Sequence, residues 1–111
     1  MTEPVQKTVD VNGAQLCYFE RGEPVTGEPS ILLVHATGFH ARCWDLVADA
    51  LAGLHSIAVD MRGHGRSSEA PPLSWDTFGA DLSALVRALD LTDLVAAGHS
   101  MGGHSVVQGS G

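Results

Sequence analysis

At residues 94–103 the chain reads LVAAGHSMGG, and no other run says as much about the fold. LVAA has the length and unbroken apolarity of a buried strand, and the residues after the elbow-like turn are compatible with a helix. Ser100 therefore falls at a sharp strand-to-helix turn, between Gly98 and Gly102, where any Cβ would crowd the neighbouring strand or helix. Such a turn exposes the serine hydroxyl. The backbone amide of Met101, at the helix N-terminus, points to where an oxyanion would form.

Two more apolar runs of strand length come earlier in the chain, ILLV at 31–34 and SIAV at 56–59. Like LVAA, they have the continuous apolarity of parallel strands that are covered on both faces. Between the second and third runs, apolar residues recur at helical spacing after Ser74, a candidate N-cap with a hydrophobic staple between Leu73 and Phe78. The residues of this stripe are Phe78, Leu82, Leu85, Val86 and Leu89.

An earlier helical pattern lies over residues 44–51, and Gly53 is placed to end it. Its apolar residues are Trp44, Val47 and Leu51. Ahead of these units, residues 5–11 and 14–19 alternate around Asn12-Gly13, which supplies the positive backbone angles of a two-residue hairpin turn. The sequence therefore predicts an α/β fold: an antiparallel hairpin, then parallel βαβαβ with helices on both faces, then the start of a further helix.

Polar, glycine-bearing segments follow all three apolar strands, namely HATGF at 35–39, DMRGHGRS at 60–67 and GHSMGG at 98–103. Open α/β sheets bind ligands at the carboxyl ends of their strands, so we expect all three segments on one edge of the sheet. In the first segment, backbone amides near Thr37 and Gly38 are candidates for the second half of an oxyanion hole. The alternative for that segment is a tight strand-to-helix turn with a capping threonine.

The segment at 60–67 has two interpretations. It is either a ligand loop, or a turn in which Asp60 and Arg62 pair while Gly63 and Gly65 allow tight packing. Of the two interpretations, we favour the structural role.

Taken together, these segments resemble the N-terminal half of the α/β-hydrolase superfamily, and the resemblance covers nearly the whole chain. HATGF stands in the HG-x-x position, with Ala36 where the family usually has glycine; DMRGHGRS stands in the D-x-R-G-x-G-x-S position; and GHSMGG stands as the nucleophile elbow. The resemblance implies that Ser100 is the nucleophile and that Thr37 and Met101 are the oxyanion-hole residues. It implies no cofactor and no metal. It also implies a truncated α/β-hydrolase domain over residues 1–111, which ends just after the elbow.

The resemblance further implies an acid and then a histidine base after the serine. Only 11 residues follow Ser100, and they contain no Asp, no Glu and one histidine, His104. His104 lies about one turn into the predicted helix, where its ring is poorly placed to take the serine proton. The resemblance makes His35, His64 and His99 turn or packing residues. An unassisted serine is a weak nucleophile, so we expect this chain alone to be nearly inert.

The composition of the chain limits the kinds of molecule that it is expected to bind. A formal net charge of -7, with six Lys plus Arg and no basic cluster, argues against nucleic acid and against an anionic membrane surface. The N-terminus lacks a signal-peptide core and the apolar runs are too short to cross a bilayer, so we expect a cytoplasmic location. Cys17 and Cys43 are expected to be reduced, and the six histidines form no compact metal motif. The strand before the elbow is expected to be an exposed apolar edge, able to pair with another chain.

The main hypothesis is a serine-dependent α/β-hydrolase acting by acyl transfer on a small-molecule ester, lactone, thioester or related carbonyl substrate, with Phe39 and Met101 in an apolar pocket wall. The alternative is a non-catalytic fragment or binding module that retains the front half of the fold. By the same resemblance, serine at the elbow disfavours the epoxide hydrolases and haloalkane dehalogenases, which use aspartate. A nucleotide-binding Rossmann domain is disfavoured because no strand is followed by GxGxxG or a P-loop.

Overall fold

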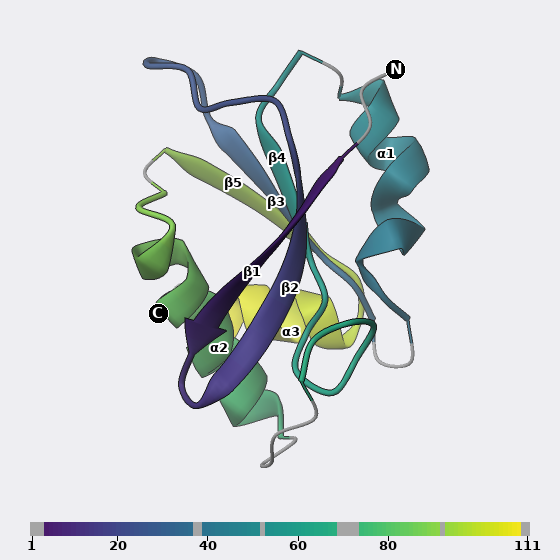
Figure 1. Ribbon diagram of the computed structural model, residues 1–111, viewed down its shortest axis with the longest axis vertical. Coiled ribbons are helices and arrows are strands. Elements are labelled where there is room, and N and C mark those ends of the chain that lie inside the picture. The colour runs from purple at the N-terminus through teal and green to yellow at the C-terminus, as the bar shows by residue number, and fades with distance from the viewer. Residues whose placement is uncertain (1–3, 37–38, 52, 69–73, 92, 110–111) are drawn as a thin grey trace.

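The computed structural model describes residues 4–36, 39–51, 53–68, 74–91 and 93–109 (Figure 1). Five strands form one mixed sheet in the order β1-β2-β4-β3-β5. The strands are β1 (Val5–Val11), β2 (Ala14–Arg21), β3 (Ser30–Val34), β4 (Ser56–Val59) and β5 (Leu94–Gly98). The helices are α1 (Asp45–Ala50), which continues a 3-10 turn over Ala41–Trp44, then α2 (Trp75–Ala88) and α3 (Met101–Gly109). This order confirms the predicted hairpin followed by βαβαβ and a final helix.

The hairpin forms for the predicted reason. Asn12 and Gly13 have φ values of 50° and 80°, the two left-handed positions of a type I′ turn, and Val11 pairs with Ala14 across it. β2 then pairs antiparallel with β4, whereas β3 pairs parallel with both β4 and β5. The parallel part of the sheet therefore directs the carboxyl ends of β3, β4 and β5 to one edge.

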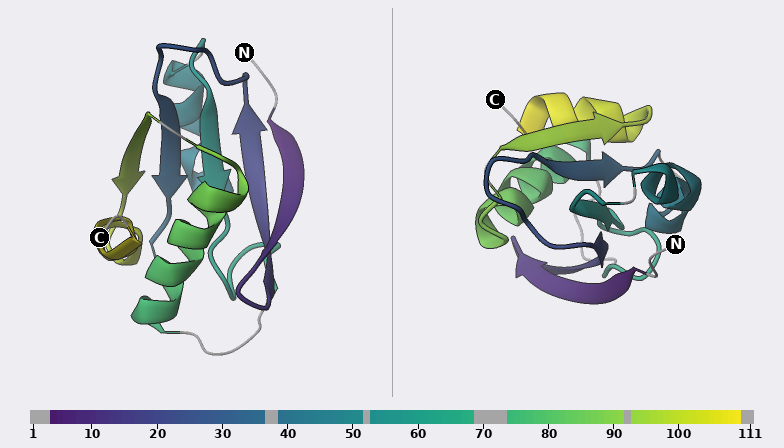
Figure 2. Two further views of the ribbon diagram at one scale, coloured as in Figure 1. Left: turned by 90° about the vertical axis from the view of Figure 1, so that its left-hand side faces the viewer. Right: turned by 90° about the horizontal axis from the view of Figure 1, so that it is seen from above.

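Helices cover both faces of the sheet (Figure 2). Alternate strand residues point to opposite sides, so Leu32 and Val34 of β3 pack toward α2, while Leu33 packs toward the 3-10 turn and α1. On the first side, the buried positions of α2 are Phe78, Leu82 and Leu85. The second side is thinner and is closed by small residues, chiefly Ala41 and Ala48. The sheet is thus the central layer of three.

α2 begins at the predicted cap. Ser74 has an extended backbone, and its hydroxyl accepts a hydrogen bond from the N–H of Thr77 at 3.2 Å, which satisfies one of the free amides at the helix start. Leu73, the other half of the predicted hydrophobic staple, lies outside the described residues. The apolar stripe and its cap together explain where this helix starts and which face it buries.

Two local predictions are wrong. Val47 is 44% exposed, because the segment opens as a tighter 3-10 turn that rotates the following residues and leaves Ala41 and Ala48 facing the sheet. β5 is also not covered on both faces: Val95 is 52% exposed. Among the described strands β5 pairs only with β3, so it is an edge strand of the sheet, which confirms the exposed apolar edge expected for the strand before the elbow.

Candidate active site

Ser100 sits between the end of β5 and the first residue of α3, and it is exposed. Its φ is +57°, a left-handed conformation that non-glycine residues seldom adopt and that costs free energy unless the surroundings enforce it. The sequence predicts a strained strand-to-helix turn at this residue, and the structure confirms that geometry. The turn projects the serine away from the strand and toward solvent at the carboxyl edge of the sheet.

The glycines around Ser100 let α3 dock closely. A Cβ on Gly98 would lie 2.5 Å from the backbone nitrogen of Gly103, and a Cβ on Gly102 would lie 2.5 Å from the carbonyl oxygen of His35. Both distances are far below van der Waals contact. In addition, the N–H of His99 donates to the carbonyl of Val34 at 3.1 Å. The turn is therefore held against the end of β3 by main-chain contacts.

Both ring nitrogens of His35, at the carboxyl end of β3, are hydrogen-bonded. Its Nε2 accepts a hydrogen bond from the N–H of Met61 at 2.9 Å, so the proton must be on Nδ1, which donates to the carbonyl of Ala36 at 2.8 Å. The side chain is buried, and burial lowers the pKa of His35 below its ordinary value. A neutral imidazole with both nitrogens occupied has no free lone pair with which to accept a proton from Ser100.

Asp60 is the second buried polar group of the edge. Its Oδ1 accepts the N–H of Ala41 at 2.7 Å, and its Oδ2 accepts the N–H of Arg66 at 3.0 Å. Its own carbonyl receives the hydroxyl of Ser67, whose oxygen in turn accepts the N–H of Cys17 at 2.7 Å. This carboxylate connects the loop after β3 with the loop after β4.

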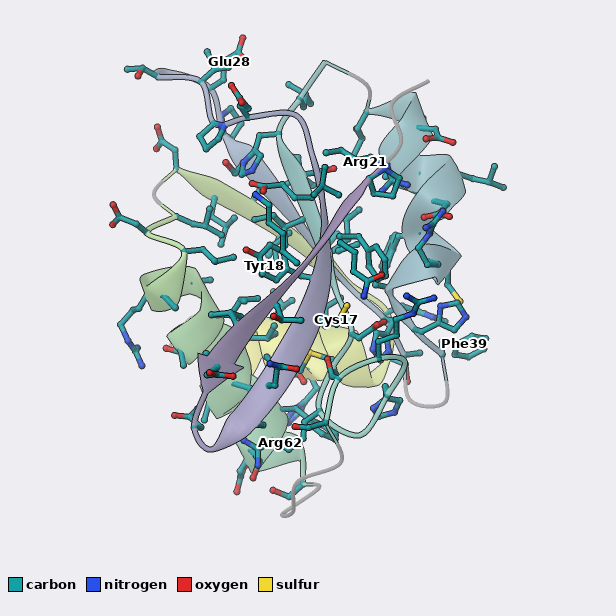
Figure 3. The ribbon with its side chains drawn as sticks, in the orientation of Figure 1. Cys17, Tyr18, Arg21, Glu28, Phe39 and Arg62 are labelled. Carbon is teal, nitrogen blue, oxygen red and sulfur yellow. The ribbon has the colours of Figure 1, made fainter. Side chains whose placement is uncertain are left out.

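Arg62 pairs with Asp81 of α2, in place of the pairing with Asp60 considered above. Two guanidinium nitrogens lie 2.9 Å and 3.0 Å from the Asp81 carboxylate, and both side chains are buried. Arg62 also donates to the carbonyl of Asn12 in the hairpin turn, at the lower end of the molecule in Figure 3. The segment at 60–67 therefore connects the hairpin, α2 and the loop after β3, which supports its structural role, but the predicted pairing of Asp60 with Arg62 is wrong.

The remaining histidines near the edge have other roles. His64 donates from Nδ1 to the carbonyl of Arg62 at 3.0 Å and packs its ring edge-on against Phe78. His99 is exposed directly before Ser100, and His104 is exposed one helical turn into α3. The packing role predicted for His35 and His64 is confirmed.

An apolar hollow of about 320 Å³ opens beside the carboxyl ends of the parallel strands. Phe39 lines it from the loop after β3, Trp44 from the 3-10 turn and Val47 from α1. His99, the residue before Ser100, lines it as well. Phe39 is exposed and points outward in Figure 3, in agreement with its predicted place in a pocket wall. The side chain of Met101, the other predicted wall residue, lies outside what the structure describes, and so does all of Thr37.

A serine, a histidine and a glutamate also occur in series at the opposite end of the sheet. The Ser30 hydroxyl lies 2.7 Å from Nδ1 of His55, and Nε2 of His55 lies 2.6 Å from the Glu20 carboxylate, which also pairs with Lys7. Ser30 is buried, however, and its N–H donates to the carbonyl of Asp93. The series lacks an exposed hydroxyl, and we interpret it as a link between strands.

Both cysteines are free, with Cys17 buried and Cys43 exposed. In the described part of the chain, no group of three or more His, Cys, Asp or Glu side chains is arranged to hold a metal ion. The described helices are also all too short or too polar to traverse a lipid bilayer.

Comparison with known proteins agrees with this architecture. Residues 31–110 match the model of the alpha/beta hydrolase family. A non-heme chloroperoxidase of Kitasatospora aureofaciens is 36% identical over 103 residues, which are 90% of this chain and 35% of that protein. Epoxide hydrolase A of Mycobacterium tuberculosis is 36% identical over 107 residues, which are 92% of this chain and 33% of that protein. The chain thus spans about a third of the length of these curated relatives.

Among solved structures, the crystal structure of a membrane phospholipase A, described as a bacterial virulence factor, superposes with a TM-score of 0.88. The two sequences are 27% identical, and the match covers 97% of this chain and 35% of the other. The similarity therefore extends over nearly the whole chain.

Proposed function

Because this chain belongs to the alpha/beta hydrolase family, we propose that Ser100 is the nucleophile of an acyl-transfer reaction on an ester, lactone, thioester or related carbonyl substrate. The observation that carries the proposal is the backbone of Ser100 itself. An exposed serine with a φ of +57°, placed between a strand and a helix, is the conformation that presents a hydroxyl to a substrate carbonyl.

In the proposed reaction, Oγ of Ser100 attacks the carbonyl carbon while its proton passes to a base, and the carbonyl π electrons move onto oxygen. The backbone amides of Met101 and Thr37 donate hydrogen bonds to that oxygen. Met101 is the first residue of α3, where the helix leaves its amides without intrahelical acceptors. One such donor contributes roughly 10²- to 10³-fold in rate. Collapse of the intermediate breaks the bond from the carbonyl carbon to the leaving oxygen or sulfur, which takes the proton back from the base. Water then gives a proton to the same base and attacks the acyl-enzyme, and its collapse releases the carboxylic acid while Oγ of Ser100 recovers a proton from the base.

The base and the acid are proposed to come from outside these 111 residues. The 11 residues after Ser100 contain no Asp or Glu, and His35 is neutral with both ring nitrogens hydrogen-bonded. Loss of the histidine from a comparable triad costs on the order of 10⁶ in kcat. The 111-residue chain alone is therefore expected to turn over substrate at close to the background rate.

The names of the relatives do not agree on one substrate, since they include a chloroperoxidase, an epoxide hydrolase and a phospholipase. The proposed serine nucleophile narrows the range of substrates to acyl compounds, because a serine alkoxide forms an ester with an acyl group. The apolar hollow lined by Phe39, Trp44 and Val47 favours a substrate with an apolar portion next to the reacting carbonyl.

A second candidate is a non-catalytic module that retains the front of the fold. The free edge of β5 and its exposed Val95 favour it, because an apolar edge strand is suited to pairing with another chain. Ester turnover by the purified 111-residue chain, measured together with its mass in solution, separates the two candidates. Robust turnover by a monomer would contradict the hypothesis of a non-catalytic module. It would also contradict the proposal that the base comes from outside these 111 residues.

A serine-reactive fluorophosphonate probe tests the nucleophile in the protein with its histidine and acid in place. We expect labelling of Ser100 that Ser100→Ala abolishes. Ser74→Ala is the matched control, because Ser74 is another exposed serine directly before a helix, but it has no left-handed turn. Labelling that persists in Ser100→Ala contradicts the proposed function.

A further inference from the structure

We propose that His35 and Asp60 are positioning residues for Ser100 chemistry, and that they fix the main chain at Ala36 and at Ala41 next to the turn that carries the serine. The inference rests on the proposed function. Both side chains are only 2% exposed, and neither takes part in the reaction steps given above. Each connects the loop after β3 to the loop after β4, and together they anchor the two ends of the same short segment.

His35 anchors the first end. Its Nδ1–H donates to the carbonyl of Ala36, which also accepts the N–H of Phe39 at 3.1 Å. Its Nε2 accepts the N–H of Met61, which belongs to the loop after β4. The ring therefore fixes the orientation of one carbonyl and one amide on separate loops, and only the neutral Nδ1–H tautomer satisfies both.

Asp60 anchors the second end. Its carboxylate accepts the N–H of Ala41, at the start of the 3-10 turn, and the N–H of Arg66 on its own loop. Hydrogen bonds from amides to an ionised carboxylate are stronger than those between neutral groups. Gly65 makes room for this arrangement, since a Cβ there would lie 2.5 Å from Oδ1 of Asp60. The glycine thus has a steric role beside the carboxylate in addition to its φ of +53°.

The anchored segment and the serine turn share a surface. Gly102 packs against the carbonyl of His35, and the N–H of His99 donates to the carbonyl of Val34. A shift of the main chain at residue 35 would therefore be transmitted directly to the residues on either side of Ser100. Thr37, the proposed second oxyanion donor, falls between the two anchors in the sequence. A displacement of about 1 Å in a catalytic constellation can cost 10²-fold in rate.

Asp81 provides a matched comparison. It is as buried as Asp60 and also holds a strong network, but its partners are Arg62 and Asn12, which connect α2 to the hairpin. None of its hydrogen bonds with described residues reaches the segment from Ala36 to Ala41. If burial of a carboxylate were all that mattered, the two aspartates would behave alike.

The experiment measures the rate constant for fluorophosphonate labelling, and kcat and KM on a simple ester, in the protein with its histidine and acid in place. Asp60→Asn keeps the shape of the side chain but turns an amide NH₂ toward one of the two N–H groups, so one of the two hydrogen bonds is lost. His35→Phe removes both hydrogen bonds of the ring, whereas His35→Gln offers one donor and one acceptor. Asp81→Asn is the control, and urea denaturation of every variant reports its stability.

We expect Asp60→Asn and His35→Phe to lower the labelling rate and kcat by about 10- to 100-fold with little change in KM, because the amides are displaced while the substrate pocket remains. His35→Gln is expected to recover most of the rate lost in His35→Phe. Asp81→Asn is expected to lower stability while its folded fraction is labelled at the unmodified rate. Equal slowing in Asp60→Asn and Asp81→Asn overturns the inference.

The inference and the proposed function fail separately. If Ser100→Ala abolishes labelling but the Asp60 and His35 variants are labelled at the unmodified rate, the positioning role is wrong and the nucleophile stands. If labelling survives Ser100→Ala, the proposed function is wrong. If a variant does not fold, two measurements on the unmodified protein still test the inference. Nitrogen NMR that finds the proton of His35 on Nε2, or hydrogen exchange that finds the Ala41 amide unprotected, overturns it.

Discussion

Replacing Gly102 by alanine should disrupt the packing of α3 against the end of β3, next to Ser100. The new Cβ would lie 2.5 Å from the carbonyl oxygen of His35 and 2.7 Å from the carbonyl carbon of Val34. Both are main-chain atoms at the end of β3, so neither can rotate away. To make room, the start of α3 must move off the sheet, and with it the left-handed turn at Ser100 that α3 holds in place.

The magnitude follows from two opposing effects. Overpacking of a close contact costs about 1–3 kcal/mol, and an immovable backbone partner puts Gly102→Ala at the upper end of that range. Alanine in a helix returns up to about 1 kcal/mol relative to glycine. Gly103→Ala is the matched control, because its Cβ would meet the carbonyl oxygen of Gly98 at 3.4 Å, an ordinary contact. We therefore expect the two variants to differ by about 2–3 kcal/mol.

Urea denaturation followed by circular dichroism measures this difference, and thermal melting should show it as a gap of about 10 °C for a domain of this size. Gly103→Ala is expected to be as stable as the unmodified chain or slightly more so. If both variants unfold at the same urea concentration, α3 does not dock through Gly102, and the close approach described above is wrong.

Three further outcomes are expected. Ser74→Ala should cost about 1 kcal/mol in urea denaturation because the cap of α2 is lost; no change would contradict the cap. Burial alone would raise the pKa of Glu20, but hydrogen bonds from Lys7 and a buried histidine hold it below the ordinary 4.5. The folded-state pKa is thus the lower one, so this stabilisation is present above pH 4.5 and is lost as the pH falls through the folded-state value; Glu20→Gln should flatten that loss, and an unchanged pH profile would refute the assignment. Self-association of the purified chain through β5, seen by sedimentation, should weaken in Val95→Lys but not in Leu46→Lys, which alters an exposed apolar residue of α1.

Local signals in the sequence predicted most of the architecture. The hairpin depends on two adjacent residues that tolerate positive φ, and the cap of α2 depends on one serine and an amide three residues later. The strands at 31–34 and 56–59 are continuous apolar runs, and the structure places them at Ser30–Val34 and Ser56–Val59. Each of these features is determined by interactions between near neighbours in the chain, which a sequence pattern records directly.

The serine turn was predictable for a related reason. A left-handed Ser100 needs a strand before it, a helix after it and no Cβ at Gly98 or Gly102, and all of these requirements appear in ten consecutive residues. The helix predicted over 44–51 is present as α1, but the sequence pattern did not identify which of its residues face the sheet. Ala48 is its buried residue, and of the larger apolar side chains in the predicted pattern Trp44 packs against the core while Val47 is exposed.

Partners distant in the chain could not be predicted. Arg62 and Asp60 are close in sequence, but Arg62 pairs with Asp81, which is 19 residues away on α2. Likewise, nothing in the letters of HATGF indicates that His35 accepts an amide 26 residues away, from Met61. Such choices depend on which groups the packed sheet leaves without a partner, and that is settled only when the layers are assembled.

These distant partners determine which role the segment at 60–67 has. In sequence it competes with HATGF and GHSMGG as a ligand loop, because all three follow a strand and carry glycines. In the structure its polar atoms are directed inward: Asp60 accepts main-chain N–H groups, and Ser67 bridges Asp60 to Cys17. The Asp60 carboxylate is buried beneath the amides that it accepts at 2.7 Å and 3.0 Å, so it is not accessible to a ligand. The chemistry of this edge therefore depends on Ser100 and on the amides around it, while the loop after β4 keeps them in place.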